Sequence, residues 1–214
     1  MEPLFSIVSK CDEEIDVEIF NRCVDSIIKF HPESEIIIVD SGSKIRTQYD
    51  RFRNNEKIHI EEINNKNYET GAIWYVYENY INDTYVFLQD SMEICEPLTR
   101  YFIYDVVYMT NDSGWPDIEN IEHVWAREQM ENIDYNFIER DRGYTMFRYN
   151  SGILKRNTLT KLKEKKLNTL LPTHKRHSQA MERIFAMCLH HEGYDVSCPK
   201  MRPHYYKKIG RNRQ

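Results

Sequence analysis

The chain has 214 residues, of which 41% are hydrophobic and 29% charged, a composition typical of soluble globular proteins. These values exclude a disordered chain, a collagen-like chain and a coiled coil. The net charge of −5 argues against nucleic-acid binding through a broad basic surface. The five cysteines form no CxxC pair, which favours buried free thiols in a reducing compartment over a disulfide framework or a cysteine-rich zinc site.

The apolar runs of the sequence are short, whereas a membrane-spanning helix needs about 20 apolar residues. The amino-terminal segment has no basic stretch followed by a long apolar one, which a secretory signal requires. We therefore expect a cytoplasmic protein without a membrane span. Because the sequence stops soon after a basic tail, we also expect that it could be one domain of a longer polypeptide.

The first ninety residues predict alternating strands and helices. Apolar runs predict strands over residues 4–8, 36–39, 58–63 and 85–88. Helical spacing predicts one helix that Asp16 caps and His31-Pro32 ends, and a second helix over residues 70–80. This β-α-β-β-α-β order predicts an α/β protein with a mostly parallel central sheet and helices on both faces.

The second half of the chain is less regular. Residues 111–148 are polar and aromatic and predict no regular element. We expect a strand over residues 148–154, which contains Asn150, and a helix within residues 155–166. A further helix ends near Gly193, and its apolar stripe consists of Met181, Ile184, Phe185, Cys188 and Leu189.

Polar side chains follow three of the predicted strands, at Ser9, Asp40 and Asp90. Ligands of open parallel sheets bind beyond the carboxyl ends of the strands, so we expect these side chains to form one site. The plainer alternative is that Asp40 and Asp90 only cap turns. Gly71 and Ala72 are small residues at the start of a predicted helix, where they would let a ribose or a phosphate approach the backbone. The alternative for these two is helix packing.

Several nucleotide-binding and hydrolase motifs are missing from the sequence. It contains no GxxxxGK[ST] and no GxGxxG after the first strand, which disfavours a P-loop enzyme and a dinucleotide enzyme. It contains neither GxSxG nor HExxH, which disfavours an α/β-hydrolase and a zinc protease.

The motifs that are present resemble a known class. Residues 36–43 (IIIVDSGS) and 85–91 (YVFLQDS) resemble the GT-A nucleotide-sugar glycosyltransferases, in which the second strand ends in an Asp that meets the nucleoside. Residues 149–154 (YNSGIL), 178–181 (SQAM) and 204–210 (HYYKKIG) are similar to segments of the retaining, glycogenin-like branch. Compact glycosyltransferases encoded by large DNA viruses have a similar character, which implies a viral protein in the host cytoplasm.

The resemblance implies an activity and a division of the chain. The activity is a metal-dependent transfer of a hexose or deoxyhexose from a UDP-sugar to a glycan or glycoprotein acceptor, with retention of configuration. A single GT-A-like domain would span residues 1–214, with a nucleotide-binding half over 1–95 and an acceptor and catalytic half over 96–214. The partners would be the donor and the acceptor, without nucleic acid.

The resemblance also implies the residues that bind the donor. Asp40 would meet the nucleoside, and Lys207 and Lys208 would neutralise the diphosphate. The strand-end and helix-start positions described above add Ser9, Gly71 and Ala72 to the residues that meet the nucleotide. The Asp-x-Asp motif of the class, which holds Mn²⁺ or Mg²⁺, is replaced by Gln89-Asp90-Ser91. Asp90 and His204 are therefore the candidate metal ligands.

Three further residues are candidates for catalysis beside Asp90. Glu182 lies about 100° around the helix from Met181, where it could line the edge of a cleft. There it could serve as a general base or stabilise an oxocarbenium-like centre. Gln179 and Asn150 carry amides that could line the sugar, and Trp115 could form a wall for the acceptor. The alternatives are an ordinary exposed glutamate and amides bonded within the core.

Two other functions remain open at this point. One is a nucleotidyltransferase that makes sugar nucleotides, which the absence of a glycine-rich phosphate loop with Arg and Lys after the first strand disfavours. The other is a binding module that kept the fold without catalysis. Release of UDP from UDP-sugars separates the three functions.

Overall fold

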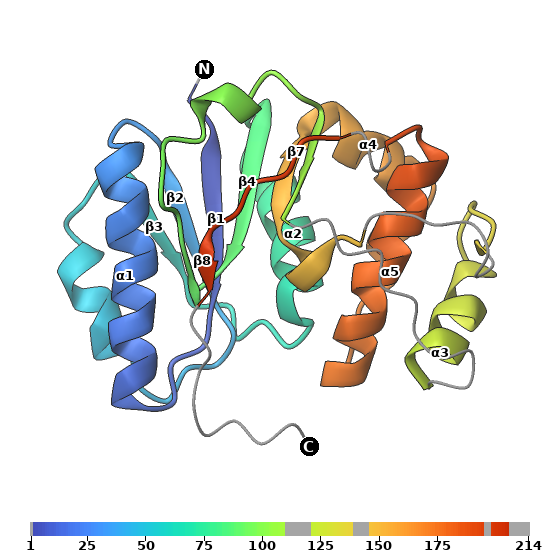
Figure 1. Cartoon of the computed structure of the whole chain (residues 1–214). Coiled ribbons are helices and arrows are strands. Elements are labelled where there is room, and N and C mark those ends of the chain that lie inside the picture. The colour runs from blue at the N-terminus through green and yellow to red at the C-terminus, as the bar shows by residue number, and fades with distance from the viewer. Residues whose placement is uncertain (1, 110–120, 139–145, 195–197, 206–214) are drawn as a thin grey trace.

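The computed structural model describes residues 2–109, 121–138, 146–194 and 198–205. Its centre is a six-stranded sheet in the order β3-β2-β1-β4-β7-β6 (Figure 1). The strands are β1 (Leu4–Ser9), β2 (Ile36–Asp40), β3 (Ile58–Glu61), β4 (Thr84–Gln89), β6 (Val106–Tyr108) and β7 (Gly152–Lys155). The first four run parallel, and β7 runs antiparallel to both β4 and β6. The expected mostly parallel α/β sheet is confirmed.

Helices cover both faces of this sheet (Figure 1). The α-helices are α1 (Glu14–Phe30), α2 (Tyr68–Asn79), α3 (Ile121–Met130), α4 (Arg156–Glu164) and α5 (Lys175–His191). The 3₁₀ helices are η1 (Thr47–Phe52), η2 (Thr99–Tyr101), η3 (Arg148–Asn150) and η4 (Leu167–Thr169). A short ribbon of β5 (Met92–Glu93) and β8 (His204–Tyr205) completes the described chain.

The buried strands divide the hydrophobic core into two layers. Successive side chains of a strand point to opposite faces of the sheet. Ile36 and Ile38 accordingly pack in the layer under α1, whereas Ile37 and Val39 pack in the layer that contains residues of α2 and α5. This two-sided burial explains why the strand sequence is continuously apolar. The predicted apolar stripe of α5 is also confirmed, since all five of its residues are buried.

Three local expectations were wrong. The N-cap of α1 is Glu13, and Asp16 lies in the first turn, where its carboxylate accepts hydrogen bonds from the backbone N–H of Asp12 (2.9 Å) and of Glu13 (3.3 Å). Residues 148–154 are not one strand, because Tyr149 and Asn150 adopt left-handed φ values of 58° and 46° and β7 begins only at Gly152. Helix α3 lies within a segment for which the sequence predicted no element.

Among the described residues, no helix combines the length and the apolar character that a membrane crossing requires. All five cysteines are free thiols, and three of them are buried.

Candidate functional site

The carboxyl ends of β1, β2 and β4 meet, as the sequence predicted. Ser9 is paired with Asp40 in the sheet register, and Val8 is paired with Gln89. The backbone N–H of Asp90 donates to the carbonyl of Val8 (3.1 Å), and the side chain of Asp90 accepts from the N–H of Lys10 (2.8 Å). The three polar strand ends therefore form one continuous edge of the sheet.

Asp40 is the fully enclosed carboxylate of this edge, with none of its surface exposed. One carboxylate oxygen accepts from the Tyr49 hydroxyl (2.8 Å) and from the N–H of Ser43 (3.1 Å), and the other accepts from the N–H of Gly42 (3.0 Å). Burial by itself would raise the pKa of Asp40, but the hydrogen bonds from Ser43, Tyr49 and Gly42 outweigh it and lower the pKa below its ordinary value. The buried Asp40 carboxylate thus fixes the backbone of the turn over residues 41–43 through hydrogen bonds.

Ser9 belongs to the same buried network. Its hydroxyl lies 3.3 Å from the Tyr49 hydroxyl, and none of its surface is exposed. The sequence placed Ser9 and Asp40 in direct contact with the nucleotide. In the structure both side chains face the protein interior. The turn over residues 41–43 that they support lies nearer the surface, since its first two residues are half-buried.

A second group of polar residues lies where α2, α5 and β4 meet. We call Glu69, Gln89, Ser178 and Glu182 the carboxylate cluster. Glu69 accepts hydrogen bonds from the amide of Gln89 (2.5 Å) and from the hydroxyl of Ser178 (2.8 Å). The ammonium group of Lys175 lies 3.9 Å from Glu69. Gln89 directly precedes Asp90, so this cluster adjoins the edge of the sheet described above.

Glu182 is the member of the cluster with the most perturbed ionisation. Burial, followed by the negative charge of Glu69, raises the pKa of Glu182 to about 7. The backbone N–H of Tyr149 and the cations Lys175 and Arg183 lower it, but by less. A carboxyl group with this pKa exchanges its proton near neutral pH, which is the property of a general acid or base.

Asn150 and Gln179 lie beside this cluster. The Asn150 amide donates to the carbonyl of Ser178 (3.1 Å), and the residue is only 1% exposed. Its carbonyl oxygen has no hydrogen-bond partner among the described residues. A buried acceptor without a donor is uncommon. Asn150 is also one of two consecutive left-handed residues, a conformation that is frequent at functional sites. Gln179 is half-buried on α5, next to Ser178.

The structure places Gly71 and Ala72 after the start of helix α2, whereas the sequence expected them to open it. Helix α2 begins at Tyr68, so Gly71 lies within its first turns and Ala72 is 2% exposed. A Cβ atom at Gly71 would lie 2.3 Å from the side-chain oxygen of Asn65. Glycine fits there because a side chain would collide with Asn65 and Asn67, which pack against the helix.

The candidate metal ligands Asp90 and His204 come from neighbouring segments. Strand β8 pairs with β5, and this register places the exposed His204 opposite Glu93, three residues after Asp90. Over the described ranges, no group of three His, Cys, Asp or Glu side chains is arranged to hold a metal ion. One carboxylate at the strand end is a partial site for a hard cation, which would need ligands from elsewhere.

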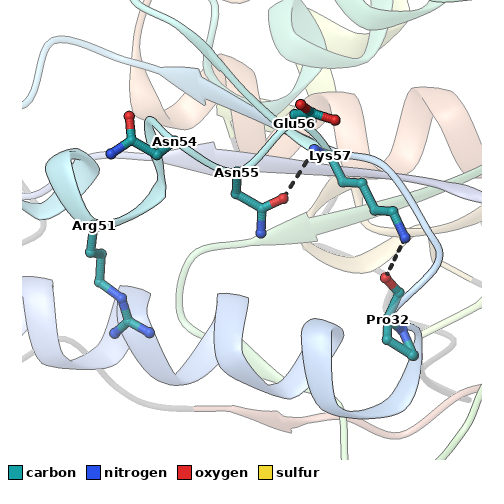
Figure 2. Close-up of a pocket in the computed structure, with 6 residues that line it drawn as sticks. All are labelled: Pro32, Arg51, Asn54, Asn55, Glu56 and Lys57. Carbon is teal, nitrogen blue, oxygen red and sulfur yellow. Dashed lines mark hydrogen bonds between the residues drawn. The ribbon is translucent and has the colours of Figure 1, made fainter.

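Three predicted residues, Trp115, Lys207 and Lys208, lie outside the described residues. The described part of the tail nevertheless ends in β8, which is labelled in Figure 1. β8 pairs with β5, and β5 begins two residues after Asp90. A separate shallow hollow lies at the amino ends of β2 and β3, away from these groups (Figure 2). Its lining residues are Pro32, Arg51, Asn54, Asn55, Glu56 and Lys57.

Sequence reasoning missed three residues of the site: Tyr49, Glu69 and Lys175. Tyr49 is in a 3₁₀ helix between strands, and its aromatic character alone does not separate it from core residues. Glu69 is in the first turn of α2, where acidic residues are common because their negative charge interacts favourably with the helix dipole. Only the contact between α2 and α5 reveals its position.

The mostly parallel sheet carries polar groups at its carboxyl edge, which is where open α/β sheets bind their ligands. No known protein-family model matches the chain, and no curated protein sequence does. Among solved structures, residues 1–349 of S. aureus TarS in complex with UDP-GlcNAc match with a TM-score of 0.51 and 14% identity, covering 86% of this chain and 53% of that one. The same TarS segment in complex with UDP matches with a TM-score of 0.50, 14% identity and coverages of 86% and 55%.

A structure of TarS that extends beyond this segment matches with a TM-score of 0.52 and 13% identity, covering 86% of this chain and 33% of that one. The chain therefore spans about half of the shorter TarS structures and a third of the longer one. At this level of identity the likeness concerns the fold alone, and it agrees with the mostly parallel α/β sheet flanked by helices that the sequence predicted.

Proposed function

We propose that the protein is a glycosyltransferase that uses a UDP-sugar as its donor. The observation that carries this proposal is the convergence of Ser9, Asp40 and Asp90 at the carboxyl edge of a parallel sheet. The fold supports it, because TarS structures of similar fold are in complex with UDP and UDP-GlcNAc. The free cysteines support a cytoplasmic location.

In this proposal the nucleoside binds against the turn over residues 41–43. Asp40 holds that turn through its bonds to Gly42, Ser43 and Tyr49, so it acts by positioning the backbone. The diphosphate extends toward Asp90, and Lys207 and Lys208 of the tail neutralise its charge.

We propose Glu182 as the general base. With a pKa of about 7, its carboxylate can accept the proton of an acceptor hydroxyl while the new glycosidic bond forms and the bond between the sugar and the diphosphate breaks. Gln179 and Asn150, whose side-chain oxygen has no hydrogen-bond partner among the described residues, would bind sugar hydroxyls in this proposal. A base in this role favours inversion, whereas the resemblance to the glycogenin-like branch implies retention. The anomeric configuration of the product decides between them.

Asp90 would hold a divalent ion, Mn²⁺ or Mg²⁺, with oxygens of the donor diphosphate completing the ligand set and His204 as a further candidate. When bound, such an ion neutralises negative charge on the leaving diphosphate. The poor set of protein ligands explains why we expect the ion and the donor to bind together.

The test is release of UDP from a panel of UDP-hexoses and UDP-deoxyhexoses with Mn²⁺ or Mg²⁺, with and without glycan acceptors. Acceptor-dependent release that Glu182→Gln abolishes supports the proposal. A requirement for a sugar phosphate and a nucleoside triphosphate would identify a nucleotidyltransferase instead. UDP binding without any turnover would identify a binding module. The absence of both UDP binding and turnover would refute the assignment.

A further inference from the structure

We propose that Glu69 is a positioning residue that joins the end of β4 to α5 through Gln89 and Ser178, and that its charge also acts on Glu182, which lies one helical turn after Ser178 on α5. This inference rests on the proposed function where turnover is concerned. Its electrostatic part concerns the folded protein alone and can be measured without any substrate.

The contacts of Glu69 place it between three elements. Its carboxylate receives one hydrogen bond from Gln89 at the end of β4 and another from Ser178 on α5, and it is itself carried by α2. Its side chain is only 12% exposed. Charge-assisted hydrogen bonds of this kind are stronger than neutral ones and fix the geometry of both partners. Movement of Glu69 would therefore displace both Gln89 and Ser178.

The same carboxylate acts on Glu182 through space. The charged groups that act on Glu182 are Glu69 from α2 and Lys175 and Arg183 from α5, while η3 contributes the backbone N–H of Tyr149. Among these groups Glu69 alone favours the protonated form of Glu182, and the other three favour the carboxylate. Lys175 lies 3.9 Å from Glu69 and is 45% exposed, so solvent screens much of its effect. Glu69 is thus the specific charge that opposes ionisation of Glu182, in addition to burial.

Glu69→Gln removes the charge and keeps the size of the side chain. We expect the midpoint at which Glu182 ionises to fall by about one pH unit, because a nearby like charge has been removed. The midpoint is read from the ¹³C carboxyl resonance of Glu182 in glutamate-labelled protein, assigned by its loss in Glu182→Gln. Glu78→Gln is the matched control, since Glu78 is on the same helix and pairs with the exposed Lys163. An unchanged midpoint in folded Glu69→Gln would overturn the proposal.

Glu69→Asp separates position from charge and covers the case in which Glu69→Gln does not fold. Aspartate keeps the charge but is shorter by one methylene, so it cannot reach both Gln89 and Ser178. We expect kcat to fall at least tenfold while the acidic limb of the pH profile stays near its wild-type position. Wild-type kcat in Glu69→Asp would reject the positioning role. If the wild-type protein shows no turnover but the Glu182 resonance still shifts in Glu69→Gln, the proposed function fails and the electrostatic role of Glu69 stands.

Discussion

Removal of the Asp40 carboxylate tests whether this buried group organises the turn at the end of β2. Asp40→Ala takes the acceptor away from the Tyr49 hydroxyl and from the Ser43 N–H, which both belong to buried residues. A buried donor that loses its acceptor costs about 1–3 kcal/mol. Because the Tyr49 hydroxyl keeps neighbours at 3.3 Å in Ser9 and Ser43, we expect a loss of about 2–4 kcal/mol, at the lower end of the sum.

The assay is urea unfolding at neutral pH, with Asp50→Ala as control. Asp50 is 65% exposed and pairs only with exposed Arg53 among the described residues, so we expect a change within about 0.5 kcal/mol. UDP affinity measured by calorimetry should fall together with stability, because the turn that we propose as the nucleoside site loses its support. An unfolding free energy of Asp40→Ala equal to that of the wild type would refute the reasoning.

The pH dependence of stability gives an independent check on Asp40. The pKa of Asp40 is lower in the folded state than its ordinary value of 3.8. Its ionised form therefore contributes stability that is fully present above that value and is lost as the pH falls through the lower folded value. The stability difference between the wild type and Asp40→Asn should shrink as the pH is lowered below about 4. A difference that grows in this range would contradict the direction of the shift.

Three further predictions concern the metal, the tail and α2. Asp90→Asn should abolish the mutual strengthening of Mn²⁺ and UDP binding, measured by calorimetry, and intact coupling would place the ion elsewhere. Truncation after Tyr205 should abolish turnover and preserve the circular dichroism spectrum, since residues 199–205 with the buried Met201 are retained; full activity would exclude the tail from the site. Gly71→Ala should lower the free energy of unfolding by about 1–3 kcal/mol, because the new Cβ would lie 2.3 Å from the Asn65 oxygen. Unchanged stability would mean that the Asn65 side chain moves aside without cost.

The sequence predicts the sheet well because its central strands are buried on both faces. A short, continuously apolar and β-branched run such as residues 36–39 is typical of a strand that helices cover on both sides. The polar groups that follow these runs are also predictable, since parallel strands bring their carboxyl ends to one edge. The proximity of Ser9, Asp40 and Asp90 can therefore be predicted from the sequence alone.

Other features depend on contacts that local sequence does not reveal. The strand expected over residues 148–154 begins late because Tyr149 and Asn150 are left-handed, which non-glycine residues rarely are. Helix α3 is missed because polar residues interrupt its weak apolar pattern. The interaction of Glu69 with Glu182 requires that α2 and α5 pack together, and these helices are far apart in the sequence. The direction in which Asp40 faces likewise depends on Tyr49, which a later 3₁₀ helix carries.

The pairing of β7 with β4 limits how the protein can be divided for experiments. β4 precedes residue 95, whereas β7 comes from the second half of the chain, and the two are hydrogen-bonded neighbours in one sheet. A fragment that stops near residue 95 would leave the apolar β4 as an open edge strand, with unpaired N–H and C=O groups available to other molecules. Such edges promote intermolecular pairing and aggregation. Insolubility of that fragment would reflect a missing neighbour strand and would say nothing about whether its residues can bind a nucleotide.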